Sequence, residues 1–215
     1  MPQHLLTETI IIAAGTEKKW LGLPNEEALR GKGVVSATFC KDTDFSDKKV
    51  IVVGSGHAAL QEAHYIADKA KEVIIVNRGN KFNASAFHQG EVFKNRKISI
   101  IYNTEVMDIL DPQKNKVTEV VLSNRQTEDK TAMPVDIVLV AIGNAPNSVL
   151  FKDQLEILPT GQIVINGKNT STNIPGVFAA GDITDMAYGR VAIASGSGAM
   201  AAMDVIRYLD SSKAP

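Results

Sequence analysis

Cysteine is nearly absent from this sequence of 215 residues, in which Cys40 is the single example. One cysteine excludes an internal disulfide and fits a reducing compartment, so we expect a cytoplasmic protein. Long hydrophobic runs are also missing, since no apolar stretch approaches the ~20 residues that a membrane helix needs. The N-terminus lacks the basic and then apolar pattern of a secretory signal, so we expect neither export nor membrane association.

An excess of charge of either sign is absent as well. The net charge is −1 with 22% charged residues, a balance that does not suggest a nucleic-acid partner. The four histidines are scattered and lack metal-ligand spacing. Hydrophobic residues make up 44% of the chain, which is ordinary for a globular protein with a core. We therefore expect one or two folded domains without a resident metal.

The stretch from Lys49 to Arg78 has the pattern of one βαβ unit. Two β-branched runs, Val50–Val53 and Val73–Val76, are typical of buried parallel strands, and a G-x-G-x-x-A fingerprint and a helical pattern lie between them. In such a fingerprint the first glycine permits a tight turn, the second lets backbone approach a pyrophosphate, and the alanine keeps the helix close to the sheet. The helix N-terminus attracts the phosphates. The residues that we expect to bind a dinucleotide here are Gly54, Ser55, Gly56, His57, Ala58 and Ala59.

The remaining pattern predicts an α/β fold, with a Rossmann-like parallel sheet and an antiparallel β-meander. Thr9–Ala14 is expected to be a buried strand, and the turn at 111–115 joins the two strands Thr104–Leu110 and Lys116–Ser123. The small residues of the last helix would permit close packing against a sheet or a flat ligand. The other expected strands are Ile98–Tyr102, Val135–Ile142, Gln162–Ile165 and Val177–Ala180, and the expected helices are Ala84–Lys94 and Val191–Leu209.

Six segments, in order and over nearly the whole chain, resemble the low-molecular-weight thioredoxin reductases and the wider pyridine nucleotide-disulfide oxidoreductase family. In that family NADPH passes a hydride to FAD, the flavin reduces a Cys-x-x-Cys disulfide, and the dithiol reduces thioredoxin. The matching segments are TIIIAAG at 9–15, LGLPNEEALRGKGV at 21–34, ATFCKD at 37–42, VIVVGSGHAALQEA at 50–63, VAIGNAPN at 140–147 and TNIPGVFAAGDITD at 172–185.

The resemblance implies an NAD(P)H-binding domain at 33–142, inserted in an FAD-binding domain made of 1–32 and 143–215. Family members begin with their own fingerprint for the ADP half of FAD, and this sequence has none there. The FAD-binding domain is therefore expected to be incomplete, with 1–32 as a remnant, and we expect this chain alone to bind FAD poorly. Val191 stands where the family has a flavin-binding glutamine. The residues that match the family's FAD site are Gly181, Asp182, Arg190, Val191 and Ala192.

The redox centre also departs from the family. Aligning Cys40 with the second cysteine places Ala37 at the first. A dithiol relay needs one thiol to attack and another to resolve, so this chain cannot complete the relay alone. Cys40 then remains as a charge-transfer or regulatory thiol, or as an inert buried residue. Asp42 lies near the family's proton-donating acid, with Lys41 between.

The resemblance further implies which residues select the nicotinamide cofactor. Arg78 matches one arginine of a family cluster that binds the 2′-phosphate of NADPH, with Asn77 beside it, and Lys81 adds a charge. No acidic residue is present to bond a ribose in the NADH manner. We therefore expect NADPH to be preferred over NADH, weakly. Ile142 and Gly143, in the matching segment at 140–147, complete the expected dinucleotide site.

Three functions fit these observations. The first is a thioredoxin reductase-like, NAD(P)H-dependent flavoprotein oxidoreductase, truncated and unable to turn over a dithiol alone. The second is a non-catalytic NADPH-binding module or fragment. The third is a dithiol-free flavoprotein similar to ferredoxin/NADP reductases. In each case we expect exposed apolar surface at Thr9–Ala14, Val177–Ala180 and Val191–Leu209, covered by a second copy or a partner chain. A thioredoxin-like protein or another carrier would accept the electrons.

Overall fold

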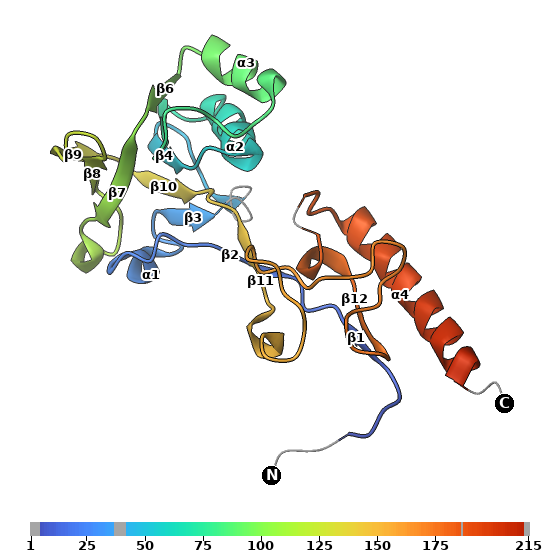
Figure 1. The fold of residues 1–215 in the computed structure, drawn as a ribbon. Coiled ribbons are helices and arrows are strands. Elements are labelled where there is room, and N and C mark those ends of the chain that lie inside the picture. Colours follow the sequence, from blue (N-terminus) through green and yellow to red (C-terminus); the bar gives the residue numbers. More distant parts are fainter. Residues whose placement is uncertain (1–4, 37–41, 186, 213–215) are drawn as a thin grey trace. The chain divides into compact units, whose positions relative to one another are not determined.

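The computed structural model describes residues 5–36, 42–185 and 187–212. Contacts divide the chain into two compact units: the central unit, Lys19–Gly143, and the flanking unit, Met1–Lys18 with Asn144–Pro215. Figure 1 shows the elements of each unit in sequence colours. The flanking unit is named for its place in the sequence on either side of the central unit.

A five-stranded parallel sheet in the order β3-β10-β4-β5-β6 forms the centre of the central unit. All its strands are rich in valine and isoleucine, whose branched side chains pack well on a pleated surface. The expected βαβ unit is confirmed, because β4 and β5 pair in parallel with α2 between them in sequence. The strands are β3 (Val34–Ser36), β4 (Lys49–Val53), β5 (Glu72–Val76), β6 (Ile98–Ile101) and β10 (Ile137–Val140), and the helices are α1 (Glu26–Leu29), α2 (His57–Ala67) and α3 (Ala86–Lys94).

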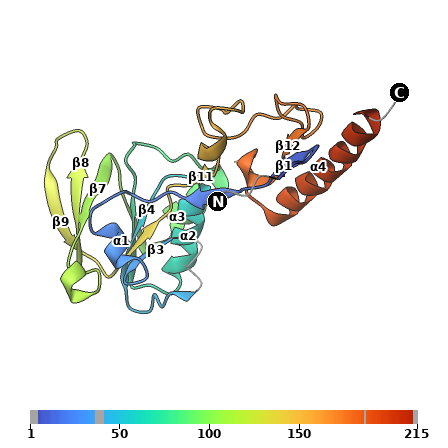
Figure 2. The ribbon, with the colours of Figure 1, turned by 90° about the horizontal axis from the view of Figure 1, so that it is seen from below.

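Alternate residues of this sheet face two different layers. Val50 and Val52 of β4 share a core with α2 and α3, which cover one face (Figures 1 and 2). Ile51 and Val53 share the other core with a three-stranded antiparallel sheet. Because both faces are covered, the parallel strands read as continuous apolar runs. The second sheet consists of β7 (Thr104–Ile109), β8 (Glu119–Asn124) and β9 (Lys130–Pro134), with η2 (Pro112–Lys114) in the β7–β8 turn.

A buried carboxylate holds the turn before α1 within residues 19–32. Glu26 is 1% exposed, and its carboxylate oxygens accept the N–H groups of Leu21 and Gly22 at 2.8 and 2.7 Å. A buried charge without such partners would be costly. Leu29 is fully buried in the core that faces the antiparallel sheet. By contact, therefore, this segment belongs with the central unit, whichever cofactor domain it serves.

The flanking unit contains two small sheets and a long helix. β1 and β12 pair in parallel, β2 and β11 pair antiparallel, and α4 packs against β12 and η4 (Figures 1 and 2). No helix in the described part of the chain, α4 included, is long and apolar enough to cross a membrane. The elements are β1 (Ile10–Ile12), β2 (Thr16–Lys18), β11 (Asn144–Pro146), η3 (Val149–Phe151), β12 (Val177–Ala179), η4 (Gly181–Ile183) and α4 (Val191–Ser212).

Two sequence expectations about strands in this unit are wrong. Gln162–Ile165 does not form a strand, and only an isolated bridge joins Ile157 to Ile163. β1 is not fully buried, since Ile10 and Ile11 are 49% and 42% exposed. Among the described strands β1 pairs only with β12, so its other edge is unpaired.

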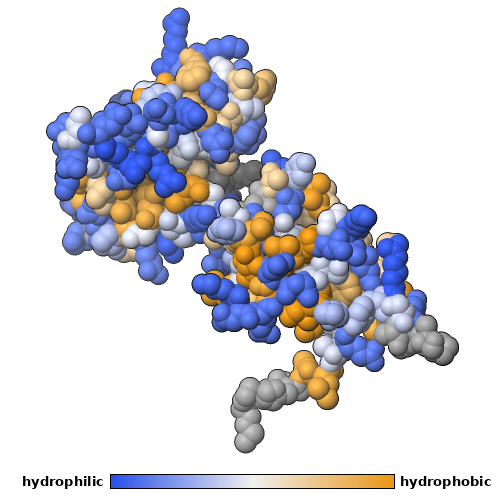
Figure 3. Space-filling model, viewed as in Figure 1, coloured by the Kyte–Doolittle hydropathy of each residue, from blue (hydrophilic) through white to orange (hydrophobic). Residues whose placement is uncertain are grey.

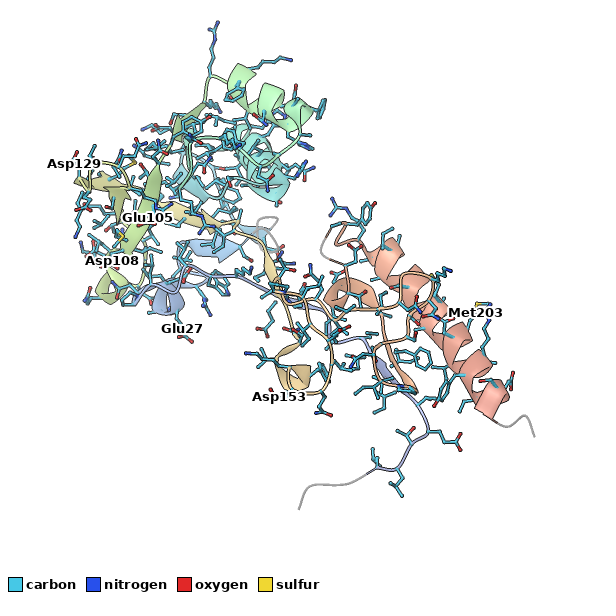
Figure 4. The ribbon with its side chains drawn as sticks, in the orientation of Figure 1. Glu27, Glu105, Asp108, Asp129, Asp153 and Met203 are labelled. Carbon is cyan, nitrogen blue, oxygen red and sulfur yellow. The ribbon has the colours of Figure 1, made fainter. Side chains whose placement is uncertain are left out.

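Exposed apolar surface is confirmed for β1 and α4 and is wrong for β12. Phe178 of β12 is 3% exposed, because α4 packs on that strand. On α4, by contrast, Met203 and Ile206 are 55% and 60% exposed, and Met203 points outward in Figure 4. Figure 3 shows hydrophobic residues gathered on the visible face of the flanking unit. Exposed apolar residues thus lie on β1 and α4, and also on η3, where Val149 and Leu150 are 82% and 84% exposed.

Asp204 holds α4 to the segment at Thr170, and we expect this interaction to weaken in acid. Its carboxylate accepts the N–H and the hydroxyl of buried Thr170 at 2.9 and 2.8 Å and lies 3.3 Å from Arg207. The Thr170 N–H is the main reason that the pKa of Asp204 is below its ordinary value. A carboxylate whose pKa is lower in the folded state stabilises the fold at pH values above its unfolded-state pKa of about 4. This stabilisation is lost as the pH falls through the folded-state pKa. Unfolding free energy measured from pH 7 to 3 should fall more steeply for the wild type than for Asp204→Asn, which should lose about 1–3 kcal/mol at pH 7. Parallel pH profiles would contradict this assignment.

Candidate functional site

The C-terminal ends of the parallel strands meet at one edge of the central sheet. In register, Val140 lies beside Val53, and Val53 lies beside Val76. The fingerprint after β4, the loop after β5 and Ile142–Gly143 after β10 therefore lie along the same edge. The chain proceeds from β4 to β5 on one side, while β10 flanks β4 on the other. Such a switch point is where open α/β sheets bind ligands.

The two glycines of the fingerprint have different surroundings. Gly54 has a φ of +152°, and a Cβ built there would lie 2.4 Å from the carbonyl oxygen of Ala141 and 2.9 Å from the Cβ of Ala59. Gly56 has a φ of −90° and a ψ of 179°, which any residue adopts, and a Cβ there would meet only the Asn83 carbonyl oxygen, at 4.0 Å. The fold thus requires a glycine at 54 but not at 56. The space beside Gly56 is a cradle that a side chain would fill, which fits a pyrophosphate.

The N-terminus of α2 faces this space without a cap. Gly56 precedes the helix, and no side chain in the described structure caps its first N–H groups. Those of the first turn, which include His57 and Ala58, are therefore available to an anion. The Ser55 carbonyl accepts the Asn83 N–H at 2.8 Å, which fixes the turn before the helix.

Hydrogen bonds tie the beginning of α2 to the beginning of α3. His57 Nε2 accepts the N–H of Ser85 at 3.0 Å, and the Ser85 hydroxyl bonds His88 Nδ1 at 2.8 Å. The two imidazole rings meet edge to face at 5.4 Å. Because Nε2 of His57 is an acceptor here, a neutral ring carries its proton on Nδ1. Ser85 and His88 are not among the site residues expected from sequence, although a serine before a helical pattern indicates a helix start.

The loop after β5 is built around Asn77. Its side chain is 1% exposed, Oδ1 accepts the Gly79 N–H at 2.9 Å, and Nδ2 donates to the Lys81 carbonyl at 3.0 Å. Because both ends of the Asn77 amide bond the loop backbone, Asn77 would act on a bound ribose only by holding the loop in place. The side chains of Arg78 and Lys81 are exposed and have no hydrogen bond or ion pair within the described residues. They remain free to pair with an anion.

The residues that match an FAD site lie together in the flanking unit. The Gly181 N–H donates to Ser197 Oγ on α4 at 2.9 Å, which brings η4 against the first turns of that helix. Asp182 is half-buried, and no described residue bonds its carboxylate. At the helix start, Arg190, Val191 and Ala192 are all exposed. The structure thus groups these five residues in one unit and the dinucleotide residues in the other.

The expected catalytic residues are only partly described. Cys40 and Ala37 lie outside the described residues. Asp42 is exposed and lines a pocket of about 580 Å³ in the central unit, together with Trp20 and Arg30. The described residues contain no cluster of His, Cys, Asp and Glu that could hold a metal ion.

This pocket combines an aromatic wall with charges of both signs. The Arg30 guanidinium lies 4.2 Å from the centre of the Trp20 ring, a cation–π arrangement. Asp44, also in the lining, supplies the negative charge. The Ser46 N–H donates to its carboxylate and lowers its pKa, so Asp44 is ionised at neutral pH. The pocket can therefore hold a polar group.

A sequence profile of the family described as pyridine nucleotide-disulphide oxidoreductase matches residues 2–201. The chain belongs to this family. Its relatives include thioredoxin reductases from Rickettsia prowazekii, 41% identical over 204 residues, and from Coxiella burnetii, 38% identical over 211 residues. These alignments cover 94% and 95% of the chain. The resemblance carried by the six sequence segments is thereby confirmed.

Solved structures of the same family have the same fold. The thioredoxin reductase of Lactococcus lactis in its FR conformation superimposes with a TM-score of 0.83 at 29% identity, and that of T. acidophilum with 0.78 at 31%. Each comparison covers 94% of the chain and 66% of the relative. This pyridine nucleotide-disulphide oxidoreductase family member therefore spans just under two thirds of the length of its relatives. The expected α/β, Rossmann-like class is confirmed.

Proposed function

We propose that the central unit binds NADPH and forms the nicotinamide stage of a thioredoxin reductase-like oxidoreductase. One observation carries the proposal: the open cradle at Gly56 lies beside the uncapped N-terminus of α2, at the switch point of the sheet. The backbone N–H groups of α2 would hold the pyrophosphate, and Ile142 and Gly143 would flank the dinucleotide at the end of β10. The bound dinucleotide supplies the hydride, while these residues position it. NADPH is favoured over NADH because Arg78 and Lys81 are unpaired in the described structure and residues 77–81 contain no acid.

FAD would be held by the flanking unit in this proposal. Asp182 offers a half-buried carboxylate, without a partner among the described residues, for ribityl hydroxyls, and the first turn of α4 offers backbone N–H groups near Arg190–Ala192. With Val191 in place of glutamine, one polar contact to a flavin is lost. We propose that this chain binds FAD weakly, with NADPH as its better ligand. The proposal keeps 33–142 for NADPH and 1–32 with 143–215 for FAD, although 19–32 pack with the central unit by contact.

The colour of the purified protein tests this assignment. A yellow protein that bleaches with NADPH supports a flavoprotein, and a colourless protein that binds NADPH supports a nucleotide-binding module. The third candidate, a flavoprotein that passes electrons to ferredoxin or another carrier, is favoured by the single cysteine. Oxidised ferredoxin, added with FAD, separates it from the first, because only the third candidate should then consume NADPH continuously.

We further propose that a second copy of the chain covers the exposed residues of β1 and α4. Apolar side chains gathered on an edge strand and on a helix are typical of an association surface. Sedimentation velocity should show self-association that increases with concentration, and Ile206→Glu should shift the protein toward monomer. Phe87→Glu, which changes a 73% exposed side chain on α3, is the matched control and should leave the equilibrium unchanged. A wild type that is monomeric at every concentration would contradict this.

A further inference from the structure

A turn distant in sequence reaches the loop after β5. The backbone N–H of Arg125, which follows β8, donates to the Asn103 carbonyl at 2.7 Å, and the Asn103 N–H donates to the Gly79 carbonyl at 2.9 Å. Asn103 has a positive φ of 51°, a conformation that asparagine tolerates better than most residues. The β8–β9 turn is therefore fixed beside the loop that carries Arg78.

The side chain of Arg125 lies at the C-terminal end of β5. Its Nη1 is 3.4 Å from the Arg78 carbonyl oxygen, and its Nε is 3.5 Å from Oε2 of Glu105, which Figure 4 shows on β7. The Arg125 side chain is 52% exposed, so part of the guanidinium still faces solvent. Arg125 therefore lies beside the backbone of Arg78, and Glu105 is the one carboxylate in ion-pair distance of it among the described residues.

The end of the second strand of a dinucleotide fold is where the adenosine ribose lies, and arginine there accommodates a 2′-phosphate. A phosphate monoester carries nearly two negative charges at neutral pH and accepts several hydrogen bonds, which planar guanidinium groups satisfy well. We infer that Arg125 is a second determinant of NADPH selectivity, acting with Arg78 on the 2′-phosphate. This inference rests on the proposed NADPH site at Gly56.

Arg125 has a competing role that is structural only. Its guanidinium contacts the Arg78 carbonyl, and could serve simply to hold the loop. A loop-holding role would affect NADPH and NADH alike, because both share the adenosine that the loop meets. A phosphate-binding role affects only the ligand with the phosphate. Affinity for the two dinucleotides therefore separates the two roles without any measurement of turnover.

The experiment is a titration of the full chain with NADPH and with NADH, followed by fluorescence of the reduced nicotinamide. Arg125→Ala should weaken NADPH binding about fivefold to tenfold and change NADH binding less than about twofold. Arg125→Lys should recover part of the loss, as a point charge without the guanidinium fork. Arg96→Ala is the matched control, since this exposed arginine precedes β6 at the opposite edge of the sheet, and it should change neither affinity.

The outcomes separate this inference from the proposed function. A wild type that binds neither dinucleotide overturns the NADPH site and the inference with it. A wild type that binds NADPH, together with Arg125→Ala that binds it equally well, overturns the inference alone. Equal losses of NADPH and NADH in Arg125→Ala assign the residue to loop structure and also overturn it. Circular dichroism of each variant confirms that the loss is not one of folding.

Discussion

Gly56→Ala is expected to reduce NADPH affinity about tenfold to a hundredfold while leaving the protein folded. A methyl group at 56 would occupy the space into which the pyrophosphate must come. The backbone there is extended and the protein leaves room for a Cβ, so the cost to stability should stay within about 1 kcal/mol, the penalty of a poorer helix cap. Nucleotide titration measures the first effect, and denaturant unfolding measures the second.

Gly54→Ala is the matched control, two positions away in the same fingerprint. Its Cβ would collide with the Ala141 carbonyl in a backbone conformation that L-residues rarely adopt. We expect a loss of about 2–5 kcal/mol in unfolding free energy from the steric overlap and the backbone strain together. If Gly56→Ala bound NADPH as tightly as the wild type, the site would have to be placed elsewhere. A destabilised Gly56→Ala would show instead that the second glycine has a structural role.

The elements predicted best from sequence are the strands that are buried on both faces. β4, β5 and β10 are buried on both faces, so their composition alone identifies them. The fingerprint was located correctly because turn, helix and second strand follow one another locally. Sequence analysis assigned Gly54 and Gly56 different roles, but it could not show that a side chain at 54 would collide with Ala141, which β10 brings beside β4.

The elements that sequence analysis missed depend on partners distant in the chain. β2 and β11 are three residues each, polar in part, and become strands only by pairing with each other. β9 contains a proline and is mostly exposed, which weakens any strand pattern. Conversely, β1 was expected to be buried because isoleucine usually is, whereas Ile10 and Ile11 are 49% and 42% exposed.

The candidate site shows the same division between local and distant signals. Asn77 and Arg78 were predicted from the family resemblance and their place after the second strand, but only the structure shows that the Asn77 amide holds the loop. Arg125 had no signal at all, since nothing in a polar hairpin turn indicates that Asn103 fastens it beside β5. The charge that selects a ligand can therefore come from a segment with no motif.

The wild-type chain is expected to show no sustained NADPH oxidation with oxidised thioredoxin, even with added FAD. Cys40 is its only thiol, so it can form one mixed disulfide with thioredoxin but has no second thiol to release it. Any thioredoxin that is trapped should therefore be stoichiometric, at no more than one per chain. An NADPH absorbance assay measures turnover, and non-reducing electrophoresis measures the mixed disulfide, which Cys40→Ala should abolish.

Ala37→Cys supplies the thiol that the family's spacing requires. Under mild oxidation this variant should lose both free thiols by forming a disulfide within the chain, whereas the wild type should keep one thiol per monomer unless two chains join. A thiol assay before and after oxidation, with electrophoresis to exclude dimers, distinguishes these results. Sustained turnover by the wild type would refute the requirement for a second thiol in this chain. An Ala37→Cys variant that keeps both thiols under oxidation would show that positions 37 and 40 do not meet, and that the alignment with the Cys-x-x-Cys motif is wrong.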